Sequence, residues 1–129
     1  MLVDTFDYLT DYDPAMPIIE VLIGAVGTVP LLCVKSLVDS GADGTILPLP
    51  QLKQIGARKY QKQWMRTATG QRAQVDMYLV AVQIGGLPSI RLAVAGNPQL
   101  TEAVVGRDLL NQFVVHLDGP AMVVELFAP

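Results

Sequence analysis

Short apolar segments separated by glycine, proline and polar turns occupy most of the chain after residue 16. Many are rich in β-branched residues, and turn signals recur about every 8–12 positions, which is typical of antiparallel sheets. The pattern predicts strands at residues 18–23, 28–38, 45–47, 65–69, 73–84, 90–95, 114–117 and 122–127. Because so little of the chain remains for helices, we expect an all-β barrel or sandwich.

Two segments carry helix signals. Residues 106–113 place Leu109, Leu110 and Phe113 on one apolar face, which predicts a short helix near the C-terminus. Residues 50–55 begin with proline and end before a glycine, an asymmetry that favours a second short helix.

The first sixteen residues differ from the rest of the chain. They contain Asp4, Asp7, Asp11 and Asp13 and lack the basic start and apolar stretch of a secretory signal. We therefore predict an acidic, irregular arm over residues 1–16. A single domain over residues 17–129 follows it, and that length suits one hydrophobic core.

Composition and charge narrow the possible partners. The chain is 51% apolar and 16% charged, which supports a packed core. Its net charge is −3 and its pI is about 4.9, so nucleic acid is not an expected partner. The longest apolar stretch, residues 21–34, contains a proline and is too short to span a bilayer, so no membrane partner is expected.

The single cysteine and the single histidine offer no obvious chemistry. Cys33 cannot form an internal disulfide, which fits a reducing compartment such as the cytoplasm. Its place in the apolar run 30–34 predicts a buried, inert side chain. His116 has no Asp or Cys at ligand spacing, so no metal site is predicted.

Basic residues concentrate in one segment. Residues 53–72 hold six of the nine lysines and arginines and no acidic residue. Such a run is either a solvated face or a surface that prefers acidic substrates or partners, and the sequence does not decide between them.

The segment 37–43 places small and polar residues directly after an apolar strand. A charged Asp39 is costly to bury, Ser40 both donates and accepts hydrogen bonds, and Gly41 permits close approach to the backbone. This loop can present a carboxylate from a rigid base, although an ordinary Asp-Ser-Gly turn has the same residues. The apolar flanks at 37–38 and 45–47 place the turn in the core rather than at a surface tip.

A second segment, residues 104–110, reads Val-Val-Gly-Arg-Asp-Leu-Leu. Together the two segments resemble those of the retropepsin-like aspartic proteases, and the resemblance extends over about residues 17–127. It implies a single-lobe acid-protease barrel with one short C-terminal helix. It also implies a substrate-covering flap hairpin with Thr69, Gly70 and Gln71 at its tip.

The same resemblance implies roles for the loop Asp39-Ser40-Gly41-Ala42-Asp43. Asp39 would be the catalytic aspartate, Ser40 would join a hydrogen-bond network between two such loops, and Gly41 would contact substrate through its backbone. Asp43 would form a bidentate, partly buried pair with Arg107 and so stiffen the loop.

Other positions would support this site. Gly106 and Asp108 flank Arg107 in the closing segment and have structural roles. Ile46 and Val105 would line apolar substrate pockets, which predicts cleavage beside hydrophobic residues. The chain departs from retroviral enzymes in three places. The flap tip has a single glycine, Gly44 replaces a polar residue, and the N-terminus does not resemble the short interface strand of those enzymes.

One such aspartate per chain implies a homodimer. Hydrolysis by this chemistry needs two carboxylates around one water, so Asp39 must come from each of two copies. The carboxylates and the water suffice, so no metal or organic cofactor is implied. The strand at 122–127 is the leading candidate for sealing the two copies together.

Three functions remain open from the sequence. The first is a homodimeric aspartic endopeptidase acting on polypeptides. The second is a catalytically silent module of the same fold that dimerises or binds peptides. The third is a protease that works only within an assembly or on its own precursor, with residues 1–16 as a pro-segment or docking tail.

Overall fold

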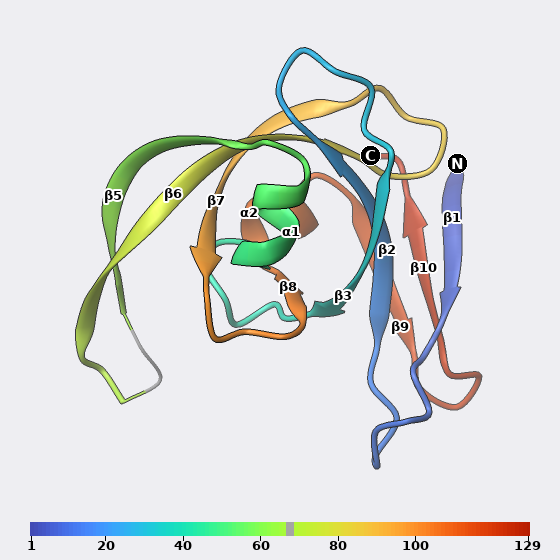
Figure 1. The fold of residues 1–129 in the computed structure, drawn as a ribbon. Coiled ribbons are helices and arrows are strands. Elements are labelled where there is room, and N and C mark those ends of the chain that lie inside the picture. Colours follow the sequence, from blue (N-terminus) through green and yellow to red (C-terminus); the bar gives the residue numbers. More distant parts are fainter. Residues whose placement is uncertain (67–68) are drawn as a thin grey trace.

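The computed structural model describes residues 1–66 and 69–129, and it consists mainly of strands (Figure 1). Residues 67 and 68, which belong to the predicted 65–69 strand, lie outside the described residues. A seven-stranded sheet has the order β2-β3-β8-β4-β7-β6-β5. Its strands are β2 (Ile18–Gly24), β3 (Leu32–Val38), β4 (Ile46–Pro48), β5 (Arg58–Arg66), β6 (Arg72–Gln83), β7 (Ile90–Asn97) and β8 (Ala103–Val105).

Additional pairing between β2 and β6 closes this sheet into a barrel. Leu22, Ile23 and Gly24 pair with Gln83, Val82 and Ala81. Two short helices accompany the barrel, α1 (Leu49–Gln54) and α2 (Arg107–Leu110). The all-β prediction is confirmed. The C-terminal helix implied by the resemblance is α2, and the second predicted helix, at residues 50–55, corresponds to α1.

A second sheet of three strands lies beside the barrel, in the order β1-β10-β9 (Figure 1). It contains β1 (Leu2–Asp7), β9 (Val114–Asp118) and β10 (Val123–Phe127), all antiparallel. Because β10 is the middle strand, both of its edges are already paired. β10 therefore has no free edge among the described strands, and its predicted part in sealing a dimer stays a prediction.

The predicted irregular conformation of the N-terminal arm is wrong for residues 2–7. They form β1, which pairs with β10 from Leu2 opposite Phe127 to Asp7 opposite Val123. Phe6 is only 7% exposed and joins the core. The acidic residues on either side of Phe6 conceal this strand in the sequence, and its pairing partner lies at the opposite end of the chain.

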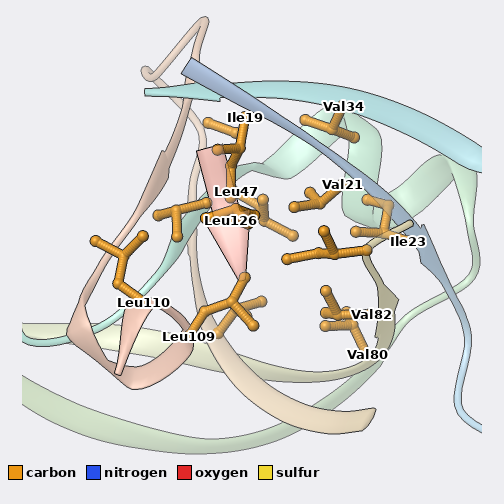
Figure 2. Close-up of a cluster of buried hydrophobic side chains, with 14 of the residues drawn as sticks. Ile19, Val21, Ile23, Val34, Leu47, Val80, Val82, Leu109, Leu110 and Leu126 are labelled. Carbon is orange, nitrogen blue, oxygen red and sulfur yellow. The ribbon is translucent and has the colours of Figure 1, made fainter. Parts of the chain in front are cut away.

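The main core fills the space between the barrel, α2 and the three-stranded sheet. Figure 2 shows its side chains gathered in one cluster, contributed by β2, β6, α2 and β10 among other elements. Burial of such aliphatic side chains supplies most of the driving force for folding. This packing fixes the ends of β3, β4 and β8, where the predicted catalytic loop begins and ends.

Cys33 is exposed, which corrects the prediction that it is buried. In β3 the side chains of Val34 and Ser36 face inward, whereas those of Cys33 and Lys35 face outward. A strand alternates its faces, so the apolar character of a run does not tell which residues turn inward. Partial desolvation by neighbouring groups still raises the pKa of the Cys33 thiol.

Candidate active site

Three adjacent strand ends hold the loop that contains Asp39. β8 lies between β3 and β4, with Val105 beside Val38 in parallel and Val104 opposite Ile46 in antiparallel register. The Asp39 amide donates to the Val105 carbonyl at 3.0 Å, which extends this ladder by one residue. The loop therefore leaves one side of β8 and returns on the other.

The carboxylate of Asp39 is oriented by its own loop. The Gly41 amide donates to Asp39 Oδ1 at 2.9 Å, and the Ala42 amide donates to the Asp39 carbonyl at 3.1 Å. A Cβ at Gly41 would lie 3.2 Å from Asp39 Oδ1, so glycine suits this close approach. Within the described residues, Asp39 Oδ2 has no hydrogen-bond partner.

The loop is more exposed than its apolar flanks predict. Asp39, Ser40 and Gly41 are all exposed in the single chain. The expectation of a turn inside the core is therefore wrong. The flanking strands are packed, but the loop projects beyond their ends.

Arg107 fastens the loop from α2. Its Nη1 donates to the Ser40 carbonyl at 2.8 Å, its Nη2 contacts Asp43 Oδ1, and its amide donates to the Ala42 carbonyl at 2.9 Å. The predicted contact between Asp43 and Arg107 is confirmed. It is neither bidentate nor partly buried, however, because one arm of the guanidinium holds Ser40 and the Asp43 side chain is 85% exposed.

Asp108 connects α2 to the far end of the loop. Its Oδ1 accepts from the Thr45 hydroxyl at 2.7 Å, and its Oδ2 accepts from the Thr45 amide at 3.0 Å. Thr45 is buried, so these bonds satisfy two polar groups that have lost water. Thr45 was not among the predicted site residues, although a threonine between Gly44 and the apolar Ile46 is a recognisable signal.

Gly106 lies against the loop with no room for a side chain. A Cβ there would come within 2.6 Å of the Gly44 carbonyl carbon and oxygen and 2.9 Å of the Ala42 carbonyl oxygen. The two sequence segments 39–45 and 106–108 are thus packed together, backbone on backbone.

The two predicted pocket residues have different positions. Val105 is 0% exposed and belongs to the core, so it cannot line a substrate pocket as predicted. The Val105 side chain lies on the inner face of β8, because successive side chains of a strand point to opposite faces. Ile46 is half-buried and lines a cleft of about 360 Å³ between the barrel and the hairpin of β5 and β6.

The β5–β6 hairpin begins earlier than predicted, at Arg58 rather than residue 65, and it projects well away from the barrel (Figure 1). Thr69, Gly70 and Gln71 are exposed near its tip, and Gly70 has a φ of 84°, which glycine adopts without strain. No helix in the described ranges is long and apolar enough to cross a membrane.

Solved structures share this fold. A retropepsin-like aspartic protease from Rickettsia conorii has a TM-score of 0.65 and 18% identity, covering 98% of this chain and 91% of its own. EIAV protease complexed with the inhibitor HBY-793 has a TM-score of 0.59 and 22% identity, covering 82% and 92%. The retroviral protease-like domain of Ddi1 from Leishmania major has a TM-score of 0.54 and 16% identity, covering 88% and 94%.

The sequence comparison agrees with the fold. No curated protein matches the chain. Residues 31–112, which contain both the Asp39 loop and the Arg107 segment, match the family described as "gag-polyprotein putative aspartyl protease". The chain therefore belongs to this family, that of the retropepsin-like aspartic proteases.

Proposed function

We propose that this protein is an aspartic endopeptidase that acts as a homodimer, with Asp39 of each copy at the catalytic centre. The observation that carries the proposal is the presentation of Asp39. One carboxylate oxygen is held by the Gly41 amide, and the other has no partner among the described residues, in an exposed loop that is braced by Arg107. A carboxylate held this way from a rigid base suits the positioning that general acid–base catalysis requires.

The chemistry needs two such carboxylates. One takes a proton from water as the water oxygen attacks the carbonyl carbon of the peptide, and the other donates a proton to the carbonyl oxygen. The tetrahedral intermediate then collapses with cleavage of the C–N bond as the amine leaving group is protonated. Only one loop of this type is present per chain, so a two-fold dimer would bring the second carboxylate. The dimer would also cover the loop, which is exposed in the single chain.

The free edge of β9 is the surface we propose for dimer formation. Phe6, Val124 and Leu117 form one row across β1, β10 and β9. Phe6 and Val124 are buried, but Leu117 is 54% exposed. β9 pairs only with β10 among the described strands, and an unpaired edge with an exposed leucine readily accepts another strand. Antiparallel pairing of two β9 strands would give one continuous six-stranded sheet.

Polypeptide is the substrate class that fits this arrangement. The cleft of about 360 Å³ runs from Ile46, just after the catalytic loop, to the inner residues of the β5–β6 hairpin. An extended peptide bound there would have its backbone aligned with strands and its side chains in alternate pockets. The lone cysteine favours work in a reducing compartment such as the cytoplasm.

Cleavage of a mixed peptide library between pH 4 and 7 tests the activity, with Asp39→Asn as the control. We expect cleavage by the wild-type protein that disappears with the substitution, because the amide cannot take up the water's proton. Cleavage that survives Asp39→Asn would refute the aspartic mechanism. Absence of cleavage by a protein that is dimeric in solution would favour the silent peptide-binding module.

Sedimentation of Leu117→Lys tests the dimer surface, and Leu31→Lys is its matched control. Leu31 is 81% exposed in the turn before β3, so the same change there should leave assembly intact. We expect the Leu117 variant to be monomeric and inactive. A Leu117 variant that is as dimeric as the wild type would exclude β9 as the interface.

A further inference from the structure

The cleft of about 360 Å³ lies where the hairpin leaves the barrel. β6 and β7 pair from Val82 opposite Ile90 to Met77 opposite Ala95, and beyond that point β6 continues into the hairpin while β7 ends at Asn97. The opening that results is a wedge between the two strands. Its apolar floor includes Ile46, Met65, Val75 and Ala95.

Two charged side chains line this wedge, Lys62 and Asp76. Asp76 is already engaged, because its Oδ2 lies 3.1 Å from Lys59 Nζ. This hydrogen-bonded ion pair also raises the pKa of Lys59. Within the described residues, Lys62 has no acidic partner of its own. Asp76 is also the cross-strand neighbour of Lys62, so Lys59 and Lys62 share one carboxylate, and the wedge has an excess positive charge beside its apolar floor.

The polar groups near the end of β7 do not alter this balance. Asn97 Oδ1 accepts from the Gln99 amide at 2.8 Å and from the Leu100 amide at 3.2 Å. That oxygen is thus used within its own loop. The strands of the hairpin also contain Arg58, Arg66 and Arg72, so the formal charge of the hairpin is positive.

We propose that Lys62 is a specificity-determining residue that selects a glutamate or aspartate side chain of the peptide in this wedge. The inference rests on the proposed function, since it concerns the substrate of the same site. The aliphatic stem of the acidic residue would lie on Ile46 and Met65, and its carboxylate would meet the Lys62 ammonium. The basic segment 53–72 thereby gains a role in substrate recognition, in addition to being a solvated face.

Binding to the Asp39→Asn variant tests this inference without relying on cleavage. The probes are fluorescent peptides that share the sequence of one library peptide. They form pairs that differ at a single position, which is Glu in one peptide and Lys in the other, and this position is moved along the peptide from pair to pair. At one position we expect the Glu peptide to bind about three- to tenfold more tightly than the Lys peptide, as a partly exposed charge pair allows. The preference should weaken in high salt, because mobile ions screen exposed charges.

A second substitution in the same background, Lys62→Glu, should reverse the preference, and Arg58→Glu is the matched control. Arg58 lies on the same strand, is exposed and does not line the wedge, so its reversal changes net charge equally but should keep the Glu preference. Equal binding of all Glu and Lys peptides, no binding of either, or a preference that survives Lys62→Glu would overturn the inference. Failure of the wild-type protein to cleave peptides is a separate result, which bears only on the proposed function.

Discussion

Replacing Gly106 with alanine tests whether the two active-site segments are packed as closely as the structure describes. The added Cβ would come within 2.6 Å of the Gly44 carbonyl carbon and oxygen, whereas ordinary contact begins at 3.4 Å. The loop must therefore retreat by about 0.8 Å. The cost is steric rather than conformational, because Gly106 has a φ of −96°, which alanine adopts freely.

Backbone atoms cannot swing aside as a flexible side chain can, so the cost should lie toward the upper end of the range for overpacking, about 1–3 kcal/mol. Urea unfolding at fixed protein concentration would measure it. With a typical dependence on urea, the midpoint should fall by about 1–2 M. The displaced loop contains Ala42 and Gly44, so peptide cleavage should decline as well.

Gly86→Ala is the matched control for this prediction. Gly86 lies in the turn before β7, and a Cβ there would meet no atom within 4 Å. The unfolding free energy of the Gly86→Ala variant should stay within about 0.5 kcal/mol of the wild-type value, as is usual for surface changes. If Gly106→Ala is equally harmless, the close backbone packing of the two segments is refuted.

Three further changes probe other parts of the molecule. Phe6→Ala should lower the unfolding free energy by about 3–5 kcal/mol in denaturant titrations, because it empties a core position; a loss below 1 kcal/mol would mean that β1 is dispensable. Asp108→Ala should cost about 1–3 kcal/mol in the same assay, since it leaves the buried Thr45 amide and the proton of the Thr45 hydroxyl without an acceptor, and an unchanged midpoint would contradict those bonds. Cys33 should be alkylated completely by iodoacetamide in the native protein, because it is exposed. The reaction at pH 8 should be slower than that of a cysteine in a short peptide, because the raised pKa of Cys33 lowers its thiolate fraction. Protection from alkylation would show that Cys33 is buried.

The chemistry of the candidate site is largely local in the sequence. Asp39, Ser40 and Gly41 are consecutive residues, and the hydrogen bond from the Gly41 amide to the Asp39 carboxylate spans only two positions. The contact of Asp43 with Arg107 was also predictable, because two separate motifs of a known family contain these residues. Strand alternation and turn residues likewise sufficed to predict an all-β fold.

Features that depend on long-range pairing were not predictable in this way. β1 is a strand because β10, at the other end of the chain, pairs with it. The pairing of β10 with both β1 and β9 makes it a central strand and leaves β9 as an edge. No local pattern contains this information, since pairing energy is gained only when distant segments meet.

The face on which a side chain lies was decided in the same way. Cys33 and Val105 both occur in apolar runs, yet Cys33 faces outward and Val105 is fully buried. A shift of one residue in register exchanges the two faces of a strand, and the neighbouring strands fix that register. The sequence by itself determined the fold class and the residues of the candidate catalytic loop, and the tertiary structure decided which side chains face the core and which face the cleft.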